Sequence, residues 1–259
     1  MISIVIVNYN SDLLLNKCLE SICNSSLNDI KIEIIIVHNN KRQCKISIKK
    51  DTLSLKNIFI GKNIGYSKAI NIGILEASYK TLITMNPDVE LKKNSISQIF
   101  NHFKSNNDIG IIGCKVLNID KSFQKSSRRR FPSLNIIIPY ILKFHSFGFT
   151  NRYNYMDLSN EKIHKVDAVS GCFMMFNKDV YSSVGGFDEQ FFLYFEDTDF
   201  CYKVTKLGLN NTYYPKAEII HLKNGSRNYI NYLFVTITFY LSFLKFILKY
   251  NRIFFKLNN

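Results

Sequence analysis

Four short runs of β-branched and aliphatic residues dominate the N-terminal part of the chain, and a cluster of polar residues follows each run. The runs are Ser3–Val7, Ile34–Val37, Ile58–Ile60 and Thr81–Met85. Continuous apolar runs of this kind are typical of strands that are buried on both faces of a parallel sheet. Because helical patterns separate the runs, the sequence predicts an α/β fold with a mostly parallel central sheet and helices on both faces.

The polar residues after these runs share one position in the predicted sheet. Asn8 follows the first strand, His38 the second, Asn63 the third and Asp88 the fourth. In an open α/β sheet the ligand crevice lies beyond the carboxyl ends of the strands. The repeated polar ends therefore predict a binding crevice along that edge.

Asp88, in the sequence Asn86-Pro87-Asp88, is a candidate metal ligand. Proteins bind Mg²⁺ through oxygen atoms, commonly one or two carboxylates together with substrate phosphates. A turn that needs no ligand explains the same three residues. His221 ends the last predicted core strand, and it is open to two interpretations, a functional residue or a hydrogen-bonded histidine of the core.

The stretch from Phe191 to Phe200 places the carboxylates of Glu196, Asp197 and Asp199 directly after a run of bulky apolar residues. Acidic residues are favoured in the first turn of a helix, and we expect a helix to begin near Glu196. A carboxylate beside an aromatic wall also suits a site that must keep one carboxylate basic. From these residues alone, helix capping and chemistry both remain open.

The composition and the absence of certain motifs limit the classes of protein to which the chain can belong. The net charge of +14 fits a nucleic acid, an anionic membrane or a phosphorylated ligand as partner, and it also fits a lysine-rich solvated surface. The sequence has no dinucleotide or P-loop glycine motif, no zinc-type Cys/His set and no serine-nucleophile elbow. Its six cysteines include no CxxC pair, so we expect reduced thiols in the cytosol. The N-terminus begins with a strand-like run and has no basic n-region or cleavage site, so we expect no signal peptide.

Five motifs together resemble family 2 glycosyltransferases, and in particular the bacterial rhamnosyltransferase-like branch. They are Ile4–Asn10, Asn63–Tyr66, Asn86–Asp88, Gly185–Glu189 and Phe192–Asp199, in this order along the chain. The resemblance extends from about Ser3 to Ser226. It implies that residues 1–226 form a GT-A domain, the fold of nucleotide-diphospho-sugar transferases, and that the protein is an inverting, metal-dependent hexosyltransferase.

The resemblance also implies roles for single residues. Asp197 would be the general base, and Asp88 and His221 would hold a divalent metal, Mg²⁺ or Mn²⁺. Binding of the nucleotide sugar is implied for Asn8, Tyr9, His38, Asn63, Gly65 and Asn86. Gly171 would line the acceptor side, and Glu196 and Asp199 would orient the acceptor or brace the base. Most relatives carry Asp where this chain has His38, and Lys68 stands where small residues are common, so the nucleotide base is left open.

The implied donor is a dTDP- or UDP-linked sugar, with rhamnose as a candidate, and the implied acceptor is a lipid-pyrophosphate-linked glycan or an oligosaccharide. The product would be a surface polysaccharide such as O-antigen or capsule, and we expect no nucleic acid as partner. One alternative is a sugar-phosphate nucleotidyltransferase, but the glycine- and lysine-rich N-terminal loop of such enzymes is missing. A second alternative is a non-catalytic basic module for nucleic acid or lipid, which leaves the three carboxylates without a role.

Residues 227–259 form a basic and aromatic tail. Aromatic residues recur along it, namely Tyr232, Phe234, Phe239, Tyr240 and Phe243. Its uncharged part, Ile230–Leu244, is shorter than the ~20 residues that span a bilayer. Three interpretations remain open: an amphipathic helix in the plane of an anionic membrane, a helix packed on the domain, or a membrane span. The first would place the protein at the inner face of the cytoplasmic membrane.

Overall fold

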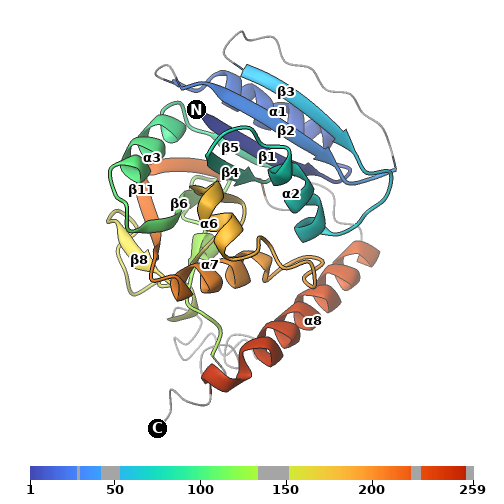
Figure 1. Cartoon of the computed structure of the whole chain (residues 1–259), viewed down its shortest axis with the longest axis vertical. Helices are drawn as coiled ribbons and strands as arrows, with labels where there is room; N and C mark the ends of the chain where they lie inside the picture. The colour runs from blue at the N-terminus through green and yellow to red at the C-terminus, as the bar shows by residue number, and fades with distance from the viewer. Residues whose placement is uncertain (28–29, 42–52, 134–151, 223–228, 255–259) are drawn as a thin grey trace.

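The computed structural model describes residues 1–27, 30–41, 53–133, 152–222 and 229–254, with the backbone alone for 229–232 and 251–254. The elements follow in the order β1 (Ile2–Asn8), α1 (Asp12–Cys23), β2 (Ile32–His38), β3 (Leu53–Phe59), α2 (Tyr66–Leu75), β4 (Thr81–Met85), β5 (Val89–Leu91), α3 (Ser95–Lys104), β6 (Ile109–Leu117), η1 (Lys125–Ser127), β7 (Arg128–Arg129), β8 (His164–Val166), β9 (Ala168–Val169), β10 (Phe173–Asn177), α6 (Lys178–Ser183), α7 (Glu196–Lys206), β11 (Asn210–His221) and α8 (Tyr229–Phe254). Figure 1 shows their arrangement.

One large sheet forms the centre of the molecule. Within the described ranges it has nine strands, in the order β3-β2-β1-β4-β10-β6-β11-β5, with β8 paired to β11. The first four strands are parallel, so Val5 lies between Ile35 on β2 and Thr84 on β4. The central sheet is as predicted, although β10 runs antiparallel between β4 and β6.

Two details of the strands differ from the sequence-based prediction. β3 begins at Leu53 and not at Ile58, because Leu53–Lys56 pairs with β2 as an edge strand whose residues alternate between half-buried and exposed. The sequence predicts the basic segment from Lys41 to Lys56 as a surface excursion, and this prediction is wrong for Leu53–Lys56. It also predicts two short strands at Asn211–Tyr214 and Glu218–His221, whereas the structure has one strand, β11, with a register shift between Tyr214 and Glu218.

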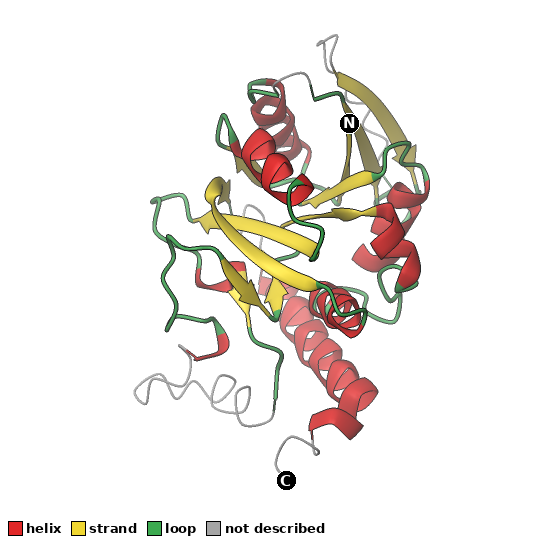
Figure 2. Cartoon of the chain, turned by 60° about the vertical axis from the view of Figure 1, so that its left-hand side comes forward, coloured by secondary structure: helices red, strands yellow, loops and turns green. Residues whose placement is uncertain are grey.

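Helices cover both faces of the sheet, as Figure 2 shows. On one face α1 and α3 pack on the sheet, and α1 contributes the buried residues Leu15, Cys18, Leu19 and Ile22. On the other face α2, α6 and α7 form a second cluster. Burial of each such aliphatic side chain contributes about 1.5–3 kcal/mol, so the two clusters hold the strand ends in fixed positions.

The helix α8 packs on this domain through one face only. Phe246 and Ile247 are buried against Phe191, Phe195 and Tyr202 in a third cluster. Of the three interpretations of the tail, packing on the domain is therefore observed for this face of the helix. Predictions that concern Cys44, residues 223–228 or Lys256 lie outside the described residues.

No disulfide joins the five cysteines in the described ranges, Cys18, Cys23, Cys114, Cys172 and Cys201, which agrees with the predicted reduced thiols.

Candidate active site

A cavity of about 550 Å³ opens at the carboxyl end of the parallel strands. Four of the residues predicted to bind the nucleotide sugar line it, namely Tyr9, Asn63, Gly65 and Asn86. The opposite wall comes from the aromatic run before α7 and from the start of α8, and it includes Phe192, Leu193, Phe234 and Val235. The crevice was predicted at this edge, but the contribution of the C-terminal helix to its wall was not.

Asn39 holds the loop that carries Asn63 and Gly65. Its amide nitrogen donates to Asn63 Oδ1 and to the carbonyl of Gly65, both at 3.1 Å, and its Oδ1 accepts from the Ile64 N–H at 2.9 Å. Gly65 has a φ of +87°, and a Cβ atom there would lie 2.9 Å from the Phe192 carbonyl oxygen. The position therefore requires glycine for conformation and for space. Asn39 was not among the predicted site residues.

Asn8 and His38 lie beneath the wall of the cavity and not on it. Both are fully buried. Asn8 donates to Asp12 Oδ1 at 2.7 Å, while His38 contacts Asn57 Oδ1 through Nε2 at 2.8 Å and stacks on Phe59. These bonds fix the ends of β1 and β2. The direct nucleotide contact that the resemblance implies for both residues is not possible in this arrangement without a movement of the wall.

Asp88 and His221 come together, although they are far apart in the sequence. His221 Nε2 lies 3.2 Å from Asp88 Oδ1, and His221 Nδ1 lies 3.0 Å from Gln124 Oε1. Because the Gln124 oxygen can only accept, Nδ1 carries a proton, and Nε2 is the atom directed at Asp88. Gln124, which sequence reasoning missed, thus orients the histidine as partners of metal-binding histidines do.

This pair fits a site for Mg²⁺ or Mn²⁺ that is completed by a ligand. Asp88 and His221 supply one oxygen and one nitrogen, and their side chains are 20% and 9% exposed. Within the described ranges no group of three His, Cys, Asp or Glu residues could hold a metal alone. Mg²⁺ typically takes only one or two carboxylates from a protein and completes its shell with water and phosphate oxygens.

The Asp197 carboxylate is fixed by four donors. Its Oδ2 accepts from Arg129 at 2.5 Å and from the Gly171 N–H at 2.8 Å, and its Oδ1 accepts from the Thr198 N–H at 2.7 Å and the Thr198 hydroxyl at 3.2 Å. The bond to the Thr198 N–H is the helix-start interaction expected of an acidic residue in this turn. Burial disfavours the charge of Arg129, but the adjacent Asp197 carboxylate raises the pKa of the guanidinium. Arg129 was not among the predicted site residues.

Glu196 lies beside Asp197 in a different environment. Its side chain is buried, and its Oε2 has no hydrogen-bond partner among the described residues. Burial, followed by the negative charge of Asp197, raises the pKa of Glu196 to about 8. Two adjacent carboxyl groups therefore differ at neutral pH, because Glu196 holds a proton while Asp197 is paired with a cation.

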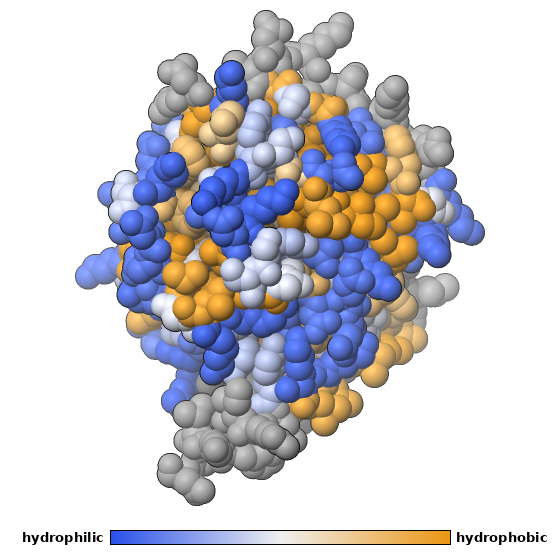
Figure 3. All heavy atoms as spheres, viewed as in Figure 1, coloured by the Kyte–Doolittle hydropathy of each residue, from blue (hydrophilic) through white to orange (hydrophobic). Residues whose placement is uncertain are grey.

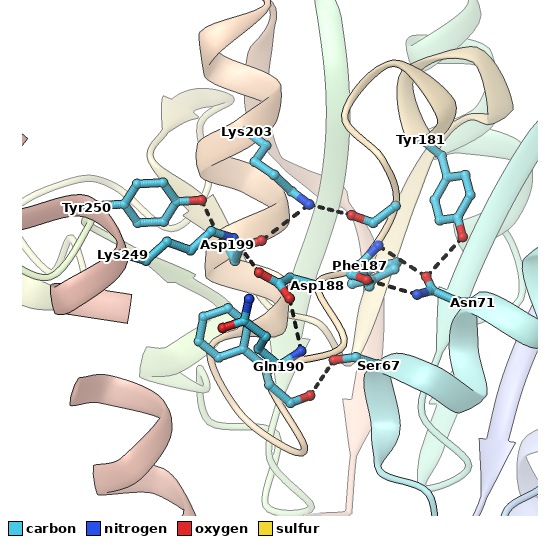
Figure 4. Close-up of polar contacts among 12 residues, drawn as sticks. Ser67, Asn71, Tyr181, Phe187, Asp188, Gln190, Asp199, Lys203, Lys249 and Tyr250 are labelled. Atoms are coloured by element: carbon cyan, nitrogen blue, oxygen red, sulfur yellow. Dashed lines mark hydrogen bonds and ion pairs between the residues drawn. The ribbon is translucent and has the colours of Figure 1, made fainter. Parts of the chain in front are cut away.

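Asp199 is fully buried and faces the C-terminal helix. Its Oδ1 accepts from Lys249 at 2.6 Å and from the Tyr250 hydroxyl at 2.7 Å, and Lys203 lies 3.4 Å from its Oδ2. Lys249 also pairs with Asp188 at 2.5 Å. Figure 4 shows how this network joins α7 and α8. These contacts fasten the first turn of α7 to α8, and the two roles expected for Asp199 stay predictions.

The two halves of the site meet at one edge of the sheet. Asn86, which follows β4, donates its N–H to the carbonyl of Cys172 at 3.0 Å. The neighbouring Gly171 donates to Asp197, as described above. A short path of backbone contacts therefore connects the turn that carries Asp88 with the carboxylate of Asp197.

Comparison with solved structures identifies the fold as GT-A. The chain superposes on GalNAc-T7 in complex with UDP, GalNAc and Mn²⁺ with a TM-score of 0.62 at 14% identity, over 86% of this chain and 44% of that one. It also superposes on the mannosyltransferase PcManGT of Pyrobaculum calidifontis in complex with GDP-Man and Mn²⁺, with a TM-score of 0.60 at 14% identity, over 86% of this chain and 58% of that one.

The chain belongs to glycosyl transferase family 2, whose family model matches residues 3–185. A second model, described as the N-terminal domain of galactosyltransferase, matches residues 151–225. These matches confirm the family that the motifs indicated.

Curated relatives point to the same branch. The chain is 25% identical to the rhamnosyltransferase WbbL of Escherichia coli K12, over 85% of this chain and 83% of the relative. It is 26% identical to the low-salt glycan biosynthesis hexosyltransferase Agl10 of Haloferax volcanii, over 85% of this chain and 66% of that protein. It is 27% identical to an N-acetylglucosaminyl-diphospho-decaprenol L-rhamnosyltransferase of Mycobacterium tuberculosis, over 64% of this chain and 58% of that protein. The chain thus spans between 58% and 83% of the length of these relatives.

Proposed function

We propose that the protein transfers a hexose, with rhamnose as the leading candidate, from a nucleotide-diphosphate donor to a lipid-linked glycan in surface polysaccharide biosynthesis. The observation that carries the proposal is one edge of the sheet, where Asn86 and Pro87 line a nucleotide-sized cavity and lead directly into a metal-type pair, Asp88 and His221. Backbone contacts connect this turn, through Cys172 and Gly171, with the fixed carboxylate of Asp197. Rhamnosyltransferases among the relatives, one of them named for a diphospho-decaprenol acceptor, support the sugar and the acceptor class.

The donor would bind in the cavity between Tyr9 and the loop of Asn63 and Gly65. Tyr9 is half exposed there and offers an aromatic face to a nucleotide base. The dTDP or UDP diphosphate would then lie towards Asn86 and Asp88. A divalent ion held by Asp88 and His221 would neutralise the charge of the departing diphosphate. Two of the solved neighbours, each with a nucleotide or nucleotide sugar and Mn²⁺, support this assignment.

The transfer would be a direct displacement with inversion at the anomeric carbon. The acceptor oxygen forms the new bond to that carbon, and the bond from that carbon to the diphosphate oxygen breaks, so the electron pair leaves with the nucleotide. Asp197 receives the proton of the acceptor hydroxyl. Its weakest donor is the Thr198 hydroxyl at 3.2 Å, and this is the contact that an incoming hydroxyl would replace.

Glu196 and Gly171 would serve the acceptor side. Because Glu196, which is 7% exposed, keeps its proton to about pH 8, its carboxyl group can both donate a hydrogen bond to a sugar hydroxyl and accept one. Gly171 lets the backbone approach Asp197, since a Cβ atom at this position would lie 3.0 Å from Asp197 Oδ2. Both features support an acceptor that is held beside the base.

A panel of nucleotide diphosphates tests the donor side. Thermal unfolding would be followed with dTDP, UDP and GDP, each with and without Mn²⁺. We expect dTDP or UDP to raise the melting temperature, and Mn²⁺ to increase that rise, because a ligand that binds only the folded state stabilises it. Transfer to a diphospholipid-linked glycan would then be measured with dTDP-rhamnose as donor. A sugar linked to the nucleotide that stabilises the protein most would be the comparison donor. Equal responses with and without Mn²⁺ would contradict the proposed site.

A further inference from the structure

The face of α8 that turns away from the domain carries a stripe of exposed apolar side chains. It consists of Leu233, Phe234, Ile237, Tyr240, Leu241, Leu244 and Leu248, each between 45% and 63% exposed. These positions fall within about a third of the circumference of a helix. In Figure 3 apolar residues gather along the lower right edge of the molecule, where α8 lies in Figure 1. A continuous exposed stripe of this kind marks an interaction surface.

The other face of α8 is fastened to the domain by polar bonds. The Ser242 hydroxyl donates to the Leu193 carbonyl at 2.8 Å, and Lys245 donates to the Gln190 carbonyl at 2.9 Å. Lys249 and Tyr250 bind Asp199, as Figure 4 shows. The segment Leu233–Tyr250 has a mean hydropathy of 1.5 and is long enough to cross a membrane. A span would break all of these bonds, whereas a helix lying in the plane of the membrane keeps them.

The charge of this part of the chain indicates what covers the stripe. No Asp or Glu follows Glu218, while Lys223, Arg227, Lys245, Lys249, Arg252 and Lys256 do. The stripe is therefore carried on a segment with positive charge only. A second copy of the chain would bring the same positive charge to the contact, whereas an anionic lipid surface would offset it.

We propose that the exposed face of α8 docks in the plane of an anionic lipid bilayer. Its leucine and aromatic side chains enter the boundary between headgroups and acyl chains, while Lys245 and Lys249 stay bound to the domain. The excess of positive charge in the C-terminal segment favours an anionic surface. The folded domain stays on the aqueous side, held by the contacts of Ser242, Lys249 and Tyr250.

Docking of α8 on a bilayer would also place the cavity close to the membrane surface. What this means for the acceptor rests on the proposed function. Phe234 and Val235, near the start of α8, line the cavity, and Phe234 also belongs to the exposed stripe. A bilayer on the stripe therefore lies next to the cavity wall. The diphosphate end of a lipid-linked glycan leaves the membrane at the headgroup level, so docking brings the acceptor close to the site.

Vesicle sedimentation tests the docking. The full chain is mixed with vesicles of phosphatidylcholine alone, or of phosphatidylcholine with phosphatidylglycerol, at low and high salt. The test variant carries Leu241→Glu and Leu248→Glu. Its control carries Leu13→Glu and Leu75→Glu, at leucines that are 82% and 70% exposed on α1 and α2. Thermal unfolding of each variant shows that it is folded, so that lost binding is not lost structure.

We expect the natural chain and the control to sediment with anionic vesicles, and the test variant to bind at least about tenfold more weakly. Equal binding by both variants, or no binding by the natural chain, would overturn the proposal. A dimer in light scattering that Leu241→Glu and Leu248→Glu dissolves would assign the stripe to self-association instead. Resistance of the bound protein to alkaline extraction would indicate a span. Transfer to a soluble acceptor is measured in parallel, since loss of lipid binding alone leaves the proposed chemistry intact.

Discussion

The nucleotide side of the cavity and its carboxylate side are held in place by different forces. Asn63 and Gly65 follow the edge strand β3, Asn86 follows the buried strand β4, and backbone and amide hydrogen bonds fix all three. Asp197 and Asp199 instead depend on cations from distant segments, Arg129 on β7 and Lys249 on α8. The first side belongs to the sheet itself, whereas the second requires that separate parts of the chain dock correctly.

This difference predicts which substitutions affect ligand binding and which affect stability. A change on the nucleotide side should alter ligand binding and leave the fold intact, because the sheet does not depend on those side chains. A change on the carboxylate side should alter stability as well as chemistry, since each buried carboxylate needs its cation.

Asp197→Asn should give the largest effect on activity. The amide keeps the size of the side chain but cannot accept the proton, so we expect transfer to fall by about 10²–10⁴-fold. Initial rates with saturating donor measure this. Asp179→Asn is the matched control, because that carboxylate lies on the surface and pairs with Lys80 at 2.6 Å. Turnover close to that of the natural protein would remove Asp197 as the base.

Arg129→Met should give the largest effect on stability. It leaves Asp197 without its cation beside Glu196, and breaking a largely buried pair costs about 3 kcal/mol. Urea unfolding would measure the free energy of unfolding. Arg152→Met, at an exposed position, is the control. A change below about 0.5 kcal/mol would show that the carboxylate side does not depend on this pair.

Lys249→Met should destabilise by a smaller amount, about 1–2 kcal/mol, because its side chain is 31% exposed and Lys203 remains near Asp199. Burial disfavours the charge of Lys249, but hydrogen bonds to Asp188 and Asp199 raise its pKa, so the cation persists at neutral pH. The same unfolding experiment measures the loss. Lys245→Met, which removes only a bond to a backbone carbonyl, is the comparison. An equal loss of unfolding free energy in Lys249→Met and Lys245→Met would show that the pairing of Lys249 with Asp199 does not stabilise the protein.

Glu196→Gln should have a larger effect on the pH dependence of the free energy of unfolding than on the magnitude of that free energy. The folded protein holds the Glu196 proton to about pH 8, whereas the unfolded chain releases it near pH 4.5. The folded state binds more protons in this window, so the free energy of unfolding decreases as the pH rises from 4.5 to 8. Melting temperatures from pH 5 to 8 should therefore decline less in Glu196→Gln than in the natural protein. Parallel curves for Glu196→Gln and for the exposed Glu189→Gln would contradict this account.

The same comparison explains what the sequence could and could not predict. Runs such as Ser3–Val7 and the polar residues after them form a local pattern, and local patterns predicted the sheet, its edge and the helix at Glu196. Arg129 and Asp197 are 68 positions apart, and Gln124 and His221 are 97 positions apart. No periodicity links such pairs, because the packing of the whole domain brings them together. The role of α8 in the cavity wall was missed for the same reason.

The central claim is that one site at this edge of the sheet binds the nucleotide diphosphate through Asp88 and activates the acceptor through Asp197. Calorimetric titration of dTDP or UDP with Mn²⁺ into the natural protein, Asp88→Ala and Asp197→Asn tests this claim most directly. We predict that Asp88→Ala lowers the Mn²⁺-dependent affinity at least about tenfold, and that Asp197→Asn stays within about twofold of the natural protein. Unchanged affinity in Asp88→Ala, or an equal loss in both variants, would contradict the division of the site into these two roles.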